Sequence, residues 1–417
     1  VVGSASIDAP GIGRISSGRF GAYEVDLASR GDALAVAWYD TRDGNAEIYL
    51  RLMQGDAFGA RSREYRLTDS ADESYEASID ALADGFAVAW YEKSSDGKLT
   101  AELGLWIPEH GFRWRRSLGI AAAAPATPVS QVDAAPSPEP VSQTDAAQSP
   151  PGSVASVESR NPVVRAWAGR VFCAWIEKSP DGVEVVRGRW FEADGTPSAE
   201  AVTLGPASAT TWNLNAAIDR DGAAVVVYDA TAGTKAAELY ATRLEGGSTT
   251  LTRLTADDGY ASKYPDLAFG ADGAALTWFD ERDGNQEVYL YVGKALEDAG
   301  RSGASVSGES LDAAARRITN TAGHSIGAYV ASSGGRYGLA WSDDTAGSYE
   351  IYFQSFSADG APEGSVHRLT STPAPSLIPA IRPYREGFAI AWTEVTRPGR
   401  AMHDASARAE IMLTAVP

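Results

Sequence analysis

The feature that most constrains the fold is an apolar segment, usually ending in tryptophan, that recurs along the chain. With its last residue as a reference column, the copies end at Trp38, Trp90, Trp175, Val227, Trp278, Trp341 and Trp392. The spacings between them are 52, 85, 52, 51, 63 and 51 residues. The repeating unit is therefore about 51 residues long and occurs seven times, with one insertion of about 34 residues and another of about 12.

Each unit reads as four short strands separated by turns rich in Gly and Asp. The first strand is short, as at residues 78–82, and the second is the apolar segment. In the second strand, large residues alternate with a small one, as in Val36-Ala37-Trp38, which predicts burial on both faces. Four short strands per repeat are typical of a β-propeller blade. The sequence therefore predicts an all-β fold, a single seven-bladed β-propeller of four-stranded blades.

The two ends of the chain predict how the ring closes. In three units an Arg-Leu-Thr segment, Arg-Ile-Thr in one of them, ends 22 residues before the next tryptophan, and Arg14-Ile15-Ser16 stands at the same distance from Trp38 with no unit in front of it. The seventh unit lacks such a strand, so we expect an N-terminal strand to complete the last blade and remove the free edges. The predicted blades span residues 17–68, 69–120, 160–205, 206–255, 256–319, 320–370 and 371–417, the last together with 11–16.

Two segments interrupt the repeat. Residues 121–159 are rich in Ala, Pro, Ser and Gln and contain a nearly duplicated stretch. Such a composition cannot bury enough apolar surface to offset the entropy of ordering, so we expect a disordered loop between blades 2 and 3. The other insertion, near 295–312, is expected between the third and fourth strands of blade 5.

Composition excludes several classes of partner. A net charge of −19 and a pI near 4.7 argue against nucleic-acid binding, since a polyanion would be repelled. No run of about 18 apolar residues predicts a membrane span. The single cysteine, Cys173, excludes an internal disulfide and falls in a large aliphatic column, so we expect a buried thiol. The N-terminus does not show the basic segment followed by an apolar one that marks a signal peptide. A signal peptide that has been removed is left open.

With these motifs in view, the repeat resembles the TolB-like (PD40, WD40-like) propeller repeat of bacterial envelope proteins. The nearest copy is RLTADDGYASKYPDLAFGADGAALTWFDERDGNQEVYL, residues 253–290. The repeat is also similar to diverged sialidase-like repeats of secreted bacterial proteins, although the Ser-x-Asp-x-Gly-x-Thr-Trp box of catalytic sialidases is absent from the sequence. The resemblance implies a propeller in the periplasm or outside the cell, with membrane anchoring through a removed N-terminal segment left open.

Two acidic columns recur in all seven units. One lies two residues after the reference column, and the other opens the third strand. Paired carboxylates are the machinery of glycosidases, but a residue present in every blade is expected to build the blade. The first acid should bond to backbone N–H groups of its turn, and the second should pair across the hairpin with Arg42 or Arg282. These arginines also disfavour calcium at the turns. No cofactor-binding motif is present, and no cofactor is predicted.

The loops joining fourth to first strands and second to third strands should emerge together on one face. The variable stretches on that face offer four aromatic candidates for ligand recognition: Tyr75, Trp212, Tyr260 and Tyr264. The sequence therefore predicts a non-enzymatic module that binds a protein or a glycan there. The alternative is a glycan-active, sialidase-like hydrolase using the same face.

An enlarged loop in blade 7 adds candidates of a different kind. It contains Arg397, Arg400, His403 and Asp404, and His324 lies in the neighbouring loop that enters blade 6. If the two histidines meet, they and the aspartate are suited to a divalent metal, while the arginines are suited to an anionic ligand. In the alternative, the two histidines are solvated loop residues that never meet.

Overall fold

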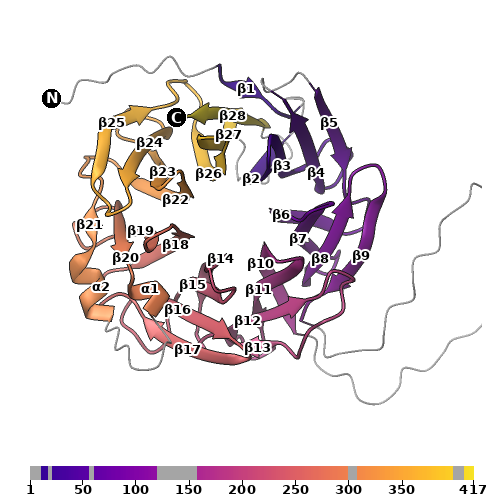
Figure 1. Ribbon diagram of the computed structural model, residues 1–417, viewed down its shortest axis with the longest axis horizontal. Coiled ribbons are helices and arrows are strands. Elements are labelled where there is room, and N and C mark those ends of the chain that lie inside the picture. The colour runs from indigo at the N-terminus through magenta and orange to yellow at the C-terminus, as the bar shows by residue number, and fades with distance from the viewer. Residues whose placement is uncertain (1–10, 17–20, 56–60, 120–156, 299–307, 398–407) are drawn as a thin grey trace, which may run out of the picture.

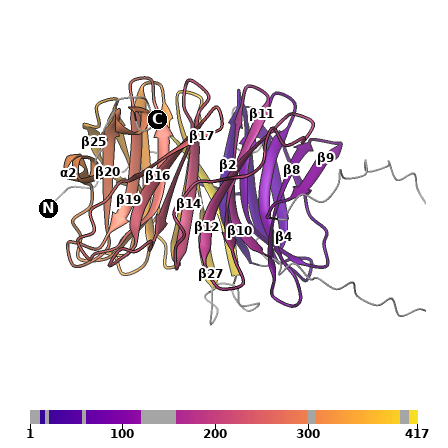
Figure 2. The same cartoon turned by 90° about the horizontal axis from the view of Figure 1, so that it is seen from below.

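The computed structural model describes residues 11–16, 21–55, 61–119, 157–298, 308–397 and 408–417. These residues form seven antiparallel sheets of four strands, arranged as blades in a ring (Figure 1). The predicted all-β, seven-bladed fold is confirmed. Seen from the side, the strands run between the two faces of a disc, with loops at both faces (Figure 2).

Within each blade the strands follow one another from the centre of the ring outward. Blade 1 contains β2 (Ala22–Arg30), β3 (Ala33–Asp40), β4 (Glu47–Gln54) and β5 (Arg61–Arg66). Blade 2 contains β6 (Glu73–Ala81), β7 (Phe86–Lys93), β8 (Leu99–Ile107) and β9 (Gly111–Ser117). Blade 3 contains β10 (Glu158–Trp167), β11 (Arg170–Lys178), β12 (Glu184–Phe191) and β13 (Val202–Thr203). Blade 4 contains β14 (Thr211–Ile218), β15 (Ala224–Ala230), β16 (Glu238–Glu245) and β17 (Ser248–Arg253).

The remaining three blades keep this order. Blade 5 contains β18 (Ser262–Phe269), β19 (Ala274–Asp280), β20 (Glu287–Gly293) and β21 (Arg316–Arg317). Its insertion lies between β20 and β21, as predicted, and includes the helices α1 (Ala295–Asp298) and α2 (Gly308–Ala314). Blade 6 contains β22 (Ser325–Ser333), β23 (Arg336–Asp343), β24 (Glu350–Ser357) and β25 (Pro362–Arg368). Blade 7 contains β26 (Ser376–Tyr384), β27 (Gly387–Arg397), β28 (Arg408–Val416) and β1 (Gly13–Arg14).

The N-terminal strand closes the ring. In blade 7 the outermost strand is β1, which pairs with β28 so that Arg14 faces Met412. The backbone N–H of Ile15 donates to Ile411, and the N–H of Ile411 donates to the Ser16 hydroxyl. The predicted closure is therefore consistent with the structure, because the first strand, β1, and the last strand, β28, lie in one sheet.

Neighbouring blades interlock through the second strands. The large side chains Val88 and Trp90 of blade 2 pack on the small Ala35 and Ala37 of blade 1. Cys173 of blade 3 belongs to the equivalent cluster against blade 2. Its side chain is buried, and this burial raises the pKa of the thiol, as expected of a core residue. Alternating bulky and small faces therefore fill the space between blades.

The first repeated acid bonds to the tryptophan of its own strand. The indole N–H of Trp38 donates to Asp40 at 3.2 Å, and that of Trp278 donates to Asp280 at the same distance. The tryptophans of blades 2, 3 and 7 make the same bond to the acid two residues later. These buried contacts confirm a structural role for this column in those blades.

The second repeated acid bonds to the Arg-Leu-Thr segment, which in blade 5 reads Arg317-Ile318-Thr319. Glu287 is fully buried and accepts hydrogen bonds from the hydroxyl of Thr319, from Arg317 at 3.0 Å and from the N–H of Thr321 at 3.0 Å. Equivalent bonds surround the corresponding acids of blades 1 and 6. We call the tryptophan, the two acids and the Arg-Leu-Thr segment the blade frame.

The predicted partners of the second acid were wrong. Arg42 and Arg282 do not pair with the glutamates that open the third strands. Arg282 instead pairs with Asp280 at 2.6 Å, and Arg42 pairs in the same way with Asp40. The reason is geometric, because the arginine follows the aspartate by two residues in a tight turn, and its guanidinium folds back over that carboxylate.

Candidate functional site

A pocket of about 540 Å³ opens in the central channel. Its walls come from the seven inner strands, with Tyr91 of β7 beside them. In blade 1, Tyr23 at the start of the inner strand pairs with Tyr39, next to the hairpin joining β3 and β4. The pocket therefore lies toward the face from which these hairpins emerge, the face predicted for recognition. Its volume is in the range of small-molecule sites.

Every inner strand carries a β-bulge at the same place. The pairing of the inner strand with the second strand shifts there by one extra residue. Within each bulge, one residue lies 14 positions before the reference column: Glu24, Glu76, Asn161, Asn213, Tyr264, Gly327 and Ile378. We call these seven residues the bulge ring.

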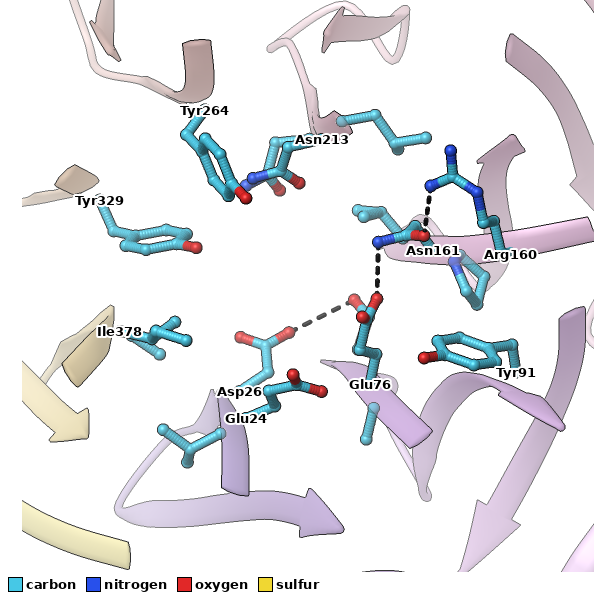
Figure 3. A pocket seen from close by; sticks show the side chains of 18 of the residues that line it. Glu24, Asp26, Glu76, Tyr91, Arg160, Asn161, Asn213, Tyr264, Tyr329 and Ile378 are labelled. Atoms are coloured by element: carbon cyan, nitrogen blue, oxygen red, sulfur yellow. Dashed lines mark hydrogen bonds between the residues drawn. The ribbon is translucent and has the colours of Figure 1, made fainter. Parts of the chain in front are cut away.

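Most of the bulge ring has an unfavourable backbone conformation. Six members have φ between 47° and 57°, and only one of these six is glycine. This left-handed region costs a non-glycine residue about 1–2 kcal/mol, and it is least favourable for a β-branched residue such as Ile378. Bulges turn side chains away from the regular alternation. The labelled bulge-ring side chains point from the surrounding blades toward the pocket (Figure 3).

Two glutamates of the ring form a pair with unusual acidity. Burial raises the pKa of Glu76 to about 7, although Arg160 and a hydrogen bond from Tyr91 act in the opposite direction. Burial, and then the charge of Glu76, raise the pKa of Glu24 well above its usual value. One carboxylate oxygen of Glu24 is buried without a hydrogen-bond partner among the described residues. The pair therefore retains a proton near neutral pH.

An arginine and an asparagine hold one side of this pair. The side-chain amide of Asn161 donates to Glu76 at 2.6 Å, and Arg160 donates to the amide oxygen of Asn161 at 2.8 Å (Figure 3). The guanidinium of Arg160 also binds both oxygens of Glu184 at 3.0 and 3.1 Å. The charge of Arg160 is thus already paired, and its role here is to orient Asn161.

Further along the inner strands, charged side chains join neighbouring blades. Arg382 of blade 7 donates to Asp26 of blade 1 at 2.8 Å, and Asp26 accepts the N–H of Ile79 in blade 2 at 3.1 Å. Asp266 of blade 5 accepts the N–H of Val330 in blade 6 at 2.9 Å. These bonds tie the inner strands together around the channel, beside the pocket.

Aromatic side chains form much of the remaining wall. Tyr264 and Trp212 are 38% and 36% exposed, and the Lys263 ammonium lies 4.2 Å from the centre of the Trp212 ring. Tyr329 and Tyr91 also line the pocket. Aromatic faces beside carboxyl and amide groups suit ligands that have both apolar and polar faces.

The four aromatic candidates fall in different places. Trp212 and Tyr264 line the pocket. Tyr260 is 51% exposed in the loop before β18 and is not among the lining residues. The expectation that Tyr75 is an exposed loop residue was wrong. It belongs to β6 and is buried, because the strand begins earlier than predicted and packs its ring 5.7 Å from that of Tyr91.

The blade 7 candidates are not brought together within the described residues. Arg397 is exposed at the end of β27, whereas Arg400, His403 and Asp404 lie outside the described residues. His324 is exposed, and its backbone N–H donates to Asp344. The described parts of the chain contain no group of three or more His, Cys, Asp or Glu side chains able to hold a metal ion. The proposed metal site stays a prediction.

Sequence reasoning missed Glu24, Glu76, Asn161 and Asn213. The signal that identifies them is the alignment itself. Counted 14 residues back from the reference column, the seven copies read Glu, Glu, Asn, Asn, Tyr, Gly and Ile, whereas the frame residues scarcely change. A position that varies within a conserved repeat, and that faces the channel, is where a propeller builds a specific site.

Comparison with known proteins finds similarity to solved structures only. No family model and no curated protein matches it. It is similar to the β-propeller domain of the trilobed protease from Pyrococcus furiosus (10% identity, 96% of this chain and 94% of that one, TM-score 0.49). It is also similar to a subtype N10 neuraminidase-like protein of A/little yellow-shouldered bat (6% identity, covering 98% of this chain and 99% of that one, TM-score 0.45).

A further similarity is to an acylaminoacyl peptidase from Pyrococcus horikoshii (10% identity, TM-score 0.48). It covers 92% of this chain but only 52% of the peptidase. No helix within the described ranges is long and apolar enough to cross a membrane. Similarity at this level concerns the fold and identifies neither a ligand nor a reaction.

Proposed function

We propose that the protein is a binding module of the bacterial envelope or exterior that holds a glycan in the channel pocket. The observation that carries the proposal is the bulge ring, in which side chains that differ from blade to blade converge on one cavity. The envelope location rests on the resemblance to TolB-like repeats.

The chemistry of the walls supports a glycan over other small ligands. The exposed rings of Tyr264 and Trp212 offer faces on which the C–H surface of a sugar can stack. Asn213 and the carboxyl groups of Glu24 and Glu76 offer donors and acceptors for hydroxyl groups. A protein ligand remains the alternative within this proposal, with a side chain inserted in place of the sugar.

A glycan array followed by calorimetry tests the proposal. For a glycan retained on the array, Tyr264→Ala should weaken binding by about 10-fold or more, because a stacking face is removed. Tyr260→Ala is the matched control, since Tyr260 is exposed but outside the pocket, and it should leave the affinity unchanged. Equal losses in the two variants, or no retained glycan, would count against the proposal.

A glycan hydrolase is the second candidate, and one observation favours it. Glu24 and Glu76 are two carboxyl groups in one pocket whose pKa values are raised by burial, and a glycosidase needs one carboxyl group that stays protonated near neutral pH. A panel of chromogenic glycosides distinguishes the two functions. If a glycoside is hydrolysed by the wild type and not by Glu76→Gln, the protein is a hydrolase rather than a binding module.

A further inference from the structure

The charges in the pocket are unequally matched. Two arginines line it, and both are already engaged: Arg160 binds Glu184, and Arg382 binds Asp26. Among the described residues no Lys or Arg forms an ion pair with Glu24, and one of its oxygens is buried without a partner. The pocket therefore offers a carboxyl group for which the protein supplies no counter-charge.

The surroundings of this carboxyl group favour a cation as its partner. Glu76 lies in the same pocket, so a positive group would reduce the repulsion between the two acids. The rings of Tyr91, Tyr264 and Tyr329, from strands β7, β18 and β22, also line the pocket (Figure 3). Aromatic rings attract a desolvated cation, and a buried carboxylate binds it with a charge-assisted hydrogen bond.

We propose that the ligand carries a positively charged amino group which binds between Glu24, Glu76 and the tyrosine rings, and that it is an amino sugar. The amino group supplies the counter-charge that the protein does not provide for Glu24, and the sugar ring occupies the aromatic wall. The inference rests on the proposed function, because it names the class of glycan. In the absence of ligand, the retained proton reduces the repulsion between the two glutamates.

Several ionisable groups line the pocket together with Glu24. They come from six strands: Asp26, Glu76, Tyr91, Arg160, Tyr264 and Tyr329. A cation binds the ionised pair, so its affinity should rise as the pH rises through the titration of Glu76, as long as the ligand amine stays protonated. A neutral sugar of the same size should show no such rise.

Calorimetry on the whole chain at pH 7 tests the proposal with three tetrasaccharides. They are a glucosamine tetramer, the N-acetylglucosamine tetramer and cellotetraose, which differ only at the 2-position. The glucosamine tetramer should bind at least about 10-fold more tightly than cellotetraose, a ratio that one desolvated charge pair can supply. In Glu24→Gln this ratio should fall toward one. The Gln variant is isosteric, and its thermal unfolding reports whether the fold is kept.

A matched charge control separates the pocket from the acidic surface. Glu363→Gln removes one charge from the exposed outer strand β25 and should leave the ratio unchanged. If Glu363→Gln and Glu24→Gln lower the ratio equally, or if wild type binds the three tetramers equally, the amino group plays no part. Equal binding would overturn this inference while leaving glycan binding intact.

A fourth ligand, the Nα-acetyl amide of lysine, distinguishes failure of the amino-group inference from failure of glycan binding. If the lysine derivative binds in a Glu24-dependent way while no tetrasaccharide binds, the pocket recognises an amino group but not a glycan. The proposed function is then wrong. If neither it nor any sugar binds, both are overturned. Tighter binding of the glucosamine tetramer that depends on Glu24 supports both.

Discussion

The blade frame and the bulge ring use similar residues for opposite purposes. In the frame, Glu287 is buried with a hydroxyl, a guanidinium and a backbone N–H around it. In the ring, Glu24 is directed at a cavity with one oxygen unpartnered. A satisfied carboxylate adds stability, whereas an unsatisfied one costs stability and is available to a ligand. A repeated acid bonded as Glu287 is therefore stabilises its blade, and the two glutamates of the ring are the candidates for function.

The sharpest test of the comparison removes a frame acid. Glu287→Ala leaves Arg317 and Thr319 without their buried partner, and the free energy of unfolding should fall by about 3–5 kcal/mol. Urea unfolding measures the loss. Glu363→Ala, on the exposed outer strand, should change it by less than about 0.5 kcal/mol. A loss below about 1 kcal/mol for Glu287→Ala would place the frame acids among the dispensable residues.

The opposite result is expected when the ring acids are neutralised. Because the pKa of Glu76 is raised in the folded protein, the unfolded chain loses this proton first, and stability falls as pH rises from about 4.5 to about 7. The double variant Glu24→Gln/Glu76→Gln lacks this loss and should exceed wild type by about 3 kcal/mol at pH 8. At pH 4 the two should unfold at the same urea concentration. A difference that persists at pH 4 would point to packing rather than ionisation.

Two glycines of blade 6 give the smallest and most local test. In Gly338→Ala the new Cβ would lie 2.9 Å from three carbons of the Phe388 ring, between two blades, and we expect a loss of about 2 kcal/mol. In Gly327→Ala the Cβ meets only Tyr329 at 3.8 Å, so the left-handed backbone alone should cost about 1 kcal/mol. Thermal unfolding compares them. Equal losses would mean that the ring is packed as tightly as the contact between blades 6 and 7.

The fold was predictable because every blade solves the same packing problem with the same residues. The spacing of the tryptophans gave seven blades, and Arg14-Ile15-Ser16 gave the closing strand. Contacts between distant parts of a blade were harder to predict. The partners of the glutamates lie in the Arg-Leu-Thr segment on the fourth strand, and sequence proximity favoured the hairpin arginines instead.

The candidate site was only partly predictable, and the bulge explains why. Trp212 and Tyr264 were identified as aromatics in variable stretches. Glu76 was not, because the inner strand of blade 2 was expected to begin at residue 78, whereas β6 begins at Glu73. An extra residue in a strand breaks the two-residue alternation that indicates which side chains face inward. Reading down the variable column would have recovered the residue.

The short strand that completes blade 7 is made long before its partner, because β1 is the first strand of the chain and β28 is the last. Ser16 bonds to Ile411, which is 395 residues later in the chain. At ordinary rates of synthesis, roughly 20–80 s separate the appearance of these two residues. Throughout that interval the strand β1 has no partner, and a second nascent chain can pair with it before β28 exists. Ring closure therefore has to wait until nearly the whole chain has been made.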